Sequence, residues 1–187
     1  MSNRRKNSSV LNDALRELLS TSIYILVVLV LAFLVVKYVG QRTEVIGSSM
    51  EYTLMDNDNL IVNKIGYIIG EPERFDIVVF PYRYEKKTYY VKRIIGLPGE
   101  TVQILDDGTI LINGEELKEY YGKEVMLDPG RASEPVLLSD DEYFVLGDNR
   151  NNSKDSRFEE VGNIKRSELM GKVWIRIYPF KEFGPVE

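Results

Sequence analysis

The sequence contains no histidine and no cysteine among its 187 residues. Without histidine it lacks the imidazole general base of the common serine hydrolases, so a nucleophilic serine would need another group to take its proton. Without cysteine it has no disulfide framework, although that absence does not fix a cellular compartment. Because Cys and His are the preferred ligands of Zn²⁺, we expect no zinc site, and we expect no other metal or cofactor.

Positive charge is scarce beyond the N-terminal region. The chain carries 24 Lys and Arg and 29 Asp and Glu; 19 and 27 of these lie beyond Lys37, which gives that part a net charge of −8. Phosphate backbones repel an acidic domain of this kind. We therefore do not expect the protein to bind nucleic acid.

One long uncharged run occupies residues 18–36, and residues 23–36 are almost wholly Ile, Leu, Val, Ala and Phe. At about 1.5 Å per residue the run spans roughly 28 Å, close to the hydrocarbon thickness of a lipid bilayer. A cleaved secretory signal is the alternative, but the run is longer than a usual signal core and no small-x-small site follows it. We therefore predict a retained transmembrane helix over residues 18–37.

The charges that flank this run predict its orientation. More positive residues precede it than closely follow it: Arg4, Arg5, Lys6 and Arg16 against Lys37 and Arg42. Positive residues favour the cytoplasmic side of a membrane. We expect a cytoplasmic tail over residues 1–17, a single pass through the cell membrane, and an extracytoplasmic domain over residues 38–187.

Short β-branched and aromatic runs separated by turn residues dominate this domain. Such runs predict strands at residues 43–46, 59–63, 76–80, 88–95, 101–105, 109–112, 142–146 and 171–178. Asp107-Gly108 and Asn113-Gly114 are hairpin turn signals. Outside the membrane we expect only a turn or two of helix, around residues 165–170. The predicted fold class is therefore mostly β, with one N-terminal transmembrane helix followed by a β-rich domain.

Ser49 and Lys92 form the candidate catalytic pair. A Gly-Ser-Ser sequence after a short strand puts Ser49 on a loop, and strand alternation sets Lys92 between Tyr90 and Ile94 on one face. Burial there would lower the pKa of the Lys92 amine, as a lysine base requires. Each segment alone also fits a plain loop serine or a strand lysine that extends to solvent. A Ser-Lys dyad would supply the base that the absent histidine cannot.

Residues 147–157, Gly-Asp-Asn-Arg-Asn-Asn-Ser-Lys-Asp-Ser-Arg, crowd many side-chain donors and acceptors into one loop. A solvated loop of turn-forming Asn and Asp is the simpler interpretation. The variety of polar types instead favours a structured support for an active site.

Four motifs follow one another along the chain: Ser-Met-x-x-Thr-Leu from Ser49, Asp-Ile-Val-Val-Phe from Asp76, Tyr-x-Lys-Arg-x-x-Gly-x-Pro-Gly-Glu from Tyr90, and Gly-Asp-Asn-Arg-x-x-Ser-x-Asp-Ser-Arg from Gly147. In this order they resemble the bacterial type I signal peptidases, which are membrane-anchored serine proteases that remove signal peptides from exported proteins. The resemblance extends from the uncharged run to Tyr178. The short stretch over residues 99–141 and the single anchor resemble the compact forms typical of Gram-positive bacteria.

The resemblance implies a role for each matching position. Ser49 would attack the scissile carbonyl, and Lys92 would act as general base and then as general acid. Ser153 would hydrogen-bond the lysine amine and orient it, and the Asp155–Arg157 ion pair would stiffen the loop. Small substrate pockets for alanine-like residues at −1 and −3 would be lined by Val45, Met50, Leu54, Tyr90 and Val91.

Three positions depart from the family pattern. Gly47 lacks the hydroxyl that in some members helps the nucleophile's own N–H to hold the oxyanion, and losing one such donor can reduce turnover about 10²- to 10³-fold. Tyr52 replaces a proline, so the turn after the nucleophile is less restricted in φ. Phe75 replaces a glycine, so we expect no positive φ at that point.

The resemblance thus implies a signal-peptidase-like catalytic domain that cleaves signal-peptide-bearing preproteins after Ala-x-Ala-type sites at the surface of a lipid bilayer. Two alternatives remain open. A catalytically impaired, membrane-anchored paralogue acting as an adaptor would have no need for all of Ser49, Lys92 and Ser153. A self-cleaving Ser-Lys autopeptidase of the repressor type would be soluble and often carries a DNA-binding region, unlike this anchored, acidic chain.

Overall fold

The computed structural model describes the backbone of residues 2–34, 40–85 and 87–186 and, within the N-terminal helix, the side chains of residues 15–33. The chain divides into an N-terminal helical unit and a second compact unit that begins at Gly40. Each unit is described by itself.

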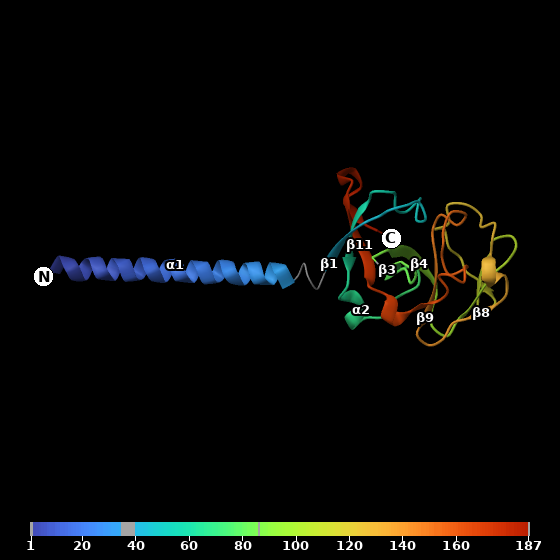
Figure 1. Ribbon diagram of the computed structural model, residues 1–187, viewed down its shortest axis with the longest axis horizontal. Helices are drawn as coiled ribbons and strands as arrows, with labels where there is room; N and C mark the ends of the chain where they lie inside the picture. The colour runs from blue at the N-terminus through green and yellow to red at the C-terminus, as the bar shows by residue number, and fades with distance from the viewer. Residues whose placement is uncertain (1, 35–39, 86, 187) are drawn as a thin grey trace. The chain divides into compact units, whose positions relative to one another are not determined.

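The described part of the N-terminal unit is one continuous helix, α1 (Ser2–Leu34), drawn in blue in Figure 1. Within it, Leu15–Phe33 is long and apolar enough to cross a membrane. Its large apolar side chains are exposed within the structure, and a bilayer would cover such a surface. The predicted apolar helix is present as far as Leu34, and residues 35–37 of the predicted span lie outside the described residues. Residues 2–17 belong to the same helix.

The second unit is mostly β, as predicted. Its larger sheet has the order β1-β2-β11-β3-β4-β9-β10, with β12 added beside β11. All of its pairings are antiparallel. The strands are β1 (Gly40–Glu44), β2 (Asn59–Asn63), β3 (Ile77–Pro81), β4 (Tyr89–Gly96), β9 (Glu142–Leu146), β10 (Ile164–Lys165), β11 (Gly171–Tyr178) and β12 (Gly184–Pro185).

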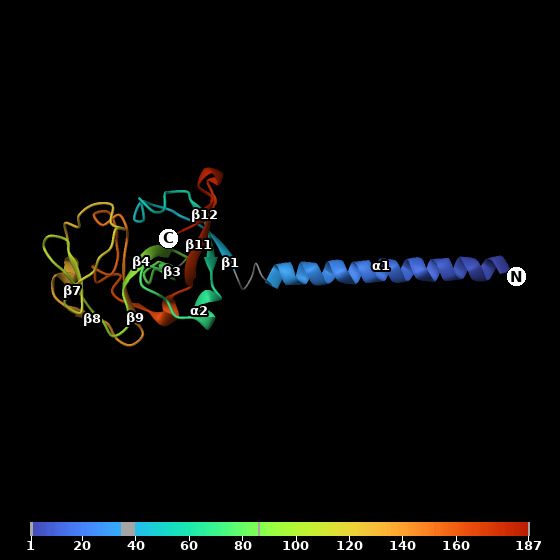
Figure 2. The same ribbon diagram turned by 180° about the vertical axis from the view of Figure 1, so that it is seen from behind.

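A smaller sheet has the order β7-β6-β5-β8. It consists of β5 (Thr101–Ile104), β6 (Ile110–Ile112), β7 (Glu115–Glu116) and β8 (Val136–Leu137). The predicted turns at Asp107-Gly108 and Asn113-Gly114 join β5 to β6 and β6 to β7, and both glycines have positive φ. Figures 1 and 2 show this sheet at the far side of the unit from β1 and β11, with β9 between them.

Little helix accompanies the sheets. A short 3₁₀ turn at Arg166–Glu168 lies where the sequence predicts a turn of helix. Three more short segments are not foreseen from the sequence: α2 (Gly66–Ile69) and the 3₁₀ turns Gly130–Ser133 and Phe180–Glu182. The strands β7, β8, β10 and β12 are not foreseen either, because two residues are too few to show an alternating pattern.

Two local predictions are wrong. The first strand lies at Gly40–Glu44 rather than at residues 43–46, because its register with β2 ends at the Glu44–Asn59 pair and Ile46 beyond it is 91% exposed. Phe75 has a φ of 74°, although glycine is absent. The Phe75 N–H donates to Ile94 O, and its ring lies 5.0 Å from that of Tyr121, so surrounding contacts hold the unfavourable backbone.

Tyr52 also has a positive φ, of 94°. Proline is locked near −65°, so a proline at this position could not adopt the backbone seen here. The turn that follows Ser49 is therefore shaped differently from one that carries proline.

Candidate active site

Strand register brings the candidate catalytic residues together. Lys92 lies within β4 opposite Val78 of β3. On the other side of β4, Arg93 pairs with Leu146, the last residue of β9, so the loop that starts at Gly147 begins beside Lys92. Ser49 lies in the β1–β2 connection, within a turn closed by the bond from the Glu51 N–H to Ser48 O. The Lys92 Nζ and Ser49 Oγ are 2.6 Å apart.

Lys92 is only 3% exposed and does not extend to solvent. Burial lowers the pKa of its amine from the ordinary value to about 8, while the carboxylates of Asp155 and Asp148 oppose part of that shift. A lysine with an ordinary pKa would be neutral in roughly one molecule in a few thousand at pH 7. With a pKa of about 8, roughly one amine in ten is neutral at pH 7 and able to accept a proton.

Ser153 lies beside this pair but does not make the contact that the family resemblance implies. Its buried Oγ has no hydrogen-bond partner among the described residues, so the expected bond to the Lys92 amine is not formed here. A Cβ on Gly147 would lie 2.2 Å from Ser153 Oγ and 2.4 Å from Ser49 O. Only glycine therefore fits between the two serines.

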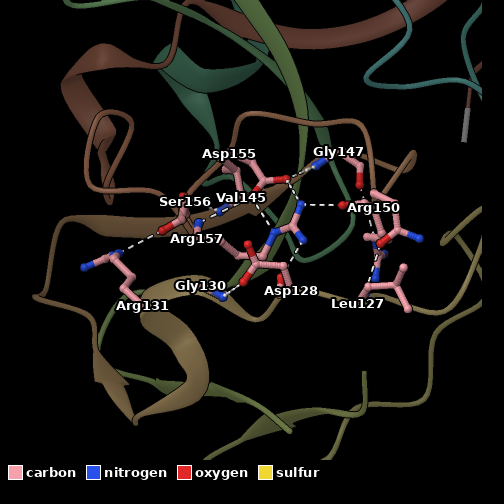
Figure 3. Close-up of polar contacts among 11 residues, drawn as sticks. Leu127, Asp128, Gly130, Arg131, Val145, Gly147, Arg150, Asp155, Ser156 and Arg157 are labelled. Atoms are coloured by element: carbon pink, nitrogen blue, oxygen red, sulfur yellow. Dashed lines mark hydrogen bonds and ion pairs between the residues drawn. The ribbon is translucent and has the colours of Figure 1, made fainter. Parts of the chain in front are cut away.

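The predicted Asp155–Arg157 ion pair is present and fully buried, with Arg157 Nε 2.8 Å from Asp155 Oδ1 (Figure 3). Asp155 also accepts a hydrogen bond from the Gly147 N–H at 3.1 Å. Arg157 donates onward to the carbonyls of Arg150 and Asp128. The pair thus fixes the backbone of the loop at Gly147.

Two asparagines of the same loop hold the serine turn. The Asn149 N–H donates to Ser49 O at 3.1 Å, and its side-chain amide donates to Ser48 O at 3.0 Å. The Asn152 amide donates to Ser48 Oγ at 2.7 Å. Loop 147–157 is therefore a structured support for the Ser49 backbone, not a solvated turn.

A cleft of about 750 Å³ opens at the dyad. The end of β1, the start of β4 and residues 151–154 line it, and four of the five predicted pocket residues are among its walls: Val45, Met50, Tyr90 and Val91. Leu54 is not in the lining. It is completely buried in the core cluster that also contains Met50 and Val45, so it supports the wall from behind.

The backbone N–H of Ser49 has no acceptor among the residues that the structure describes. It is thus free to donate to an oxygen of a bound substrate. Gly47 offers no equivalent donor, because its N–H already donates to Asp56 Oδ1 at 2.8 Å. Its φ of 97° suits glycine.

The sequence does not predict a buried polar network that lies next to the dyad. Arg93 is 0% exposed and forms a two-pronged ion pair with Asp148, with N–O distances of 3.0 and 2.8 Å. The Thr53 hydroxyl donates to the same carboxylate, and the guanidinium lies 3.6 Å from the centre of the Tyr121 ring. The network ties the Ser49 turn, β4 and loop 147–157 together. Its only sequence signal is the position of Arg93 and Asp148 inside two recognisable motifs.

Comparison with known proteins gives consistent matches. The family model described as "Signal peptidase, peptidase S26" matches residues 17–178. A probable signal peptidase I-2 of Synechocystis is 39% identical over 160 residues, which cover 83% of this chain and 71% of the relative. Signal peptidase I P of Bacillus subtilis subsp. natto is 38% identical and covers 83% and 86%. Signal peptidase IB of Staphylococcus aureus is 37% identical and covers 90% and 93%.

A crystal structure of a signal peptidase I from Enterococcus faecalis V583 is 36% identical in sequence. It matches with a TM-score of 0.43 and covers 55% of this chain and 97% of that chain.

Proposed function

The chain belongs to the signal peptidase S26 family, and from that premise we propose that Ser49 and Lys92 carry its reaction and that it cuts preproteins after Ala-x-Ala-type sites. A type I signal peptidase is a serine endopeptidase that removes signal peptides. The observation that carries the proposal is the separation of 2.6 Å between Ser49 Oγ and the buried Lys92 Nζ.

In the proposed reaction, the neutral Lys92 amine takes the proton of the Ser49 hydroxyl as Oγ attacks the scissile carbonyl carbon. The carbonyl oxygen becomes an oxyanion, and the free Ser49 N–H stabilises it. The Lys92 ammonium then gives its proton to the leaving amine, and the peptide C–N bond breaks. Water, deprotonated by Lys92, hydrolyses the acyl-enzyme ester and restores Ser49.

The supporting residues act by position. Asp155 and Arg157 hold Gly147 against Ser49, and Asn149 fixes the Ser49 carbonyl. The nucleophile is therefore already positioned beside the lysine before substrate binds. Ser153 has an unused hydroxyl next to the dyad. We propose that Ser153 orients the Lys92 amine through a hydrogen bond that would form in the substrate complex.

The substrate chain would occupy the cleft over Val45, Met50, Tyr90 and Val91. Apolar walls of this kind favour small side chains at −1 and −3, because a large one would displace buried neighbours. The apolar helix would keep the enzyme in the plane where its substrates are inserted, which raises the effective concentration of both. We place residues 1–17 in the cytoplasm, residues 18–37 in the bilayer and residues 38–187 outside.

The full chain, purified in detergent, is expected to cut a model preprotein after an Ala-x-Ala site, and N-terminal sequencing of the product identifies the bond. Replacing the −1 alanine of the substrate by phenylalanine is expected to lower kcat/KM by about 10²-fold or more, because the pocket is too small. A −1 serine substrate is the size-matched control. Equal cleavage of the phenylalanine and alanine substrates would overturn the proposed specificity.

The pH profile tests the role of Lys92 separately. Since its pKa is lowered to about 8 and the neutral form is the active one, kcat/KM is expected to rise about tenfold per pH unit below that value and to level off above it. The loss on acidification reflects protonation of the amine. A profile that is flat between pH 6 and pH 9 (within about twofold) contradicts a lysine base.

A further inference from the structure

A second cleft, of about 570 Å³, reaches loop 147–157 at Arg150. The β5–β6 turn, the segment 116–126 and Tyr52 line most of it, and Arg150 completes the lining. It shares no lining residue with the first cleft, yet consecutive residues of one loop reach both: Arg150 lines the second and Asn151 the first.

Arg150 lines this cleft and carries an unused hydrogen-bond donor. Its side chain is 3% exposed, its Nε donates to Gly147 O at 3.1 Å, and its Nη1 lies 2.8 Å from Glu119 Oε1. Its buried Nη2 has no partner in the part of the chain that the structure describes. A buried guanidinium N–H without an acceptor is unfavourable, so a ligand oxygen that accepts from Nη2 would be stabilised there.

The charge of the cleft limits what that ligand can be. Four carboxylates line it against the single arginine: Asp107, Glu116, Glu119 and Glu124. Glu116 and Glu124 are exposed, as are the rings of Tyr52 (71%) and Tyr120 (88%). Phosphate and other anions would be repelled, whereas a cation would be attracted by the carboxylates and could rest on an aromatic ring.

A peptide with a basic side chain meets both requirements, because its backbone carbonyl can accept from Arg150 Nη2 while its ammonium faces the acids. We propose that this cleft is a second subsite for the polypeptide substrate and binds a lysine- or arginine-containing segment of the preprotein. Proximity supports this assignment: Tyr52 follows Ser49 by three residues, and Arg150 is bonded to the Gly147 carbonyl. The assignment to the preprotein rests on the proposed function.

The test measures binding to the full-length Ser49→Ala protein in detergent, so it does not depend on cleavage. The probes are a short acetylated and amidated peptide that contains lysines and a matched peptide with norleucine in their place. The lysine peptide is expected to bind about fivefold more tightly, a preference that rising salt removes. At saturation it is expected to shift the NMR resonances of the Arg150 guanidinium and of the Gly122 backbone amide.

Glu116→Gln with Glu124→Gln is expected to abolish the preference, because it removes two exposed cleft charges while keeping an acceptor oxygen at each position. Glu115→Gln with Glu134→Gln makes the same charge change at exposed positions outside the cleft and is expected to retain it. Equal binding of both peptides overturns the proposal, and so does an unmoved Arg150 resonance at saturation. Should Ser49→Ala still cleave preproteins, the proposed dyad fails while this binding result remains readable.

Discussion

Lys92→Arg is expected to lower the rate of preprotein cleavage by about 10⁴-fold or more, as is Ser49→Ala. Arginine fills a similar volume but stays protonated at any working pH, so it cannot accept the Ser49 proton. Because nucleophile and base act as one unit, the double variant is expected to be no slower than either single variant. The measurement is single-turnover cleavage of a model preprotein by the full chain in detergent.

Lys181→Arg is the matched control, since Lys181 is exposed and is not among the residues that line the cleft. It is expected to retain full activity. Near-normal turnover by Lys92→Arg would exclude lysine as the base, despite the distance of 2.6 Å between Lys92 Nζ and Ser49 Oγ. A double variant that is much slower than both single variants would show that the two residues contribute independently.

The sequence predicts those parts of this fold that local chemistry determines. The runs 59–63, 142–146 and 171–178 match strands β2, β9 and β11 to the residue. Short runs of β-branched and aromatic residues bounded by turns strongly favour strands. Alternation along β4 sets Lys92 on the same face as Tyr90 and Ile94, but it does not decide burial, because both faces of the strand are buried from Lys92 onward. The first strand is the exception, because its ends depend on pairing with β2, which no local pattern reveals.

The parts that could not be predicted depend on contacts between distant segments. The positive φ of Phe75 is held by Ile94 and Tyr121, and neither is near it in the chain. Motif matching alone predicts a hydrogen bond between Ser153 and the Lys92 amine, yet the buried Ser153 hydroxyl has no partner among the described residues. The second cleft unites a β-turn, a long connection and Arg150, which only the folded arrangement brings together.

The Arg93–Asp148 pair is expected to be the largest single electrostatic contribution to the integrity of the site. Asp148→Ala leaves the guanidinium fully buried without its carboxylate, which is expected to lower the free energy of unfolding by about 3–5 kcal/mol. Typical domains have only about 5–15 kcal/mol in total, so the loss is a large fraction of the stability. Denaturant unfolding of the full chain in detergent, followed by the fluorescence of Trp174, measures it.

Two comparisons separate a buried charge effect from a general loss of contacts. Glu160→Ala breaks the Lys154–Glu160 pair, whose side chains are 64% and 58% exposed, and is expected to change stability by less than about 0.5 kcal/mol. Arg93→Met combined with Asp148→Leu removes both charges and is expected to be more stable than Asp148→Ala alone. If the double variant is instead the least stable, the pair contributes chiefly through its geometry.

Asp148→Ala is also expected to change the pH dependence of catalysis in the molecules that stay folded. The Asp148 carboxylate raises the pKa of Lys92, so its loss lowers that pKa. The Arg93 guanidinium, no longer balanced by the Asp148 charge, would lower it further, so both changes act in the same direction. The rise of kcat/KM with pH is therefore expected to move to lower pH in this variant. Glu160→Ala should leave the profile in place. An unmoved profile in Asp148→Ala would mean that the buried network holds the shape of the site without affecting the proton affinity of its base.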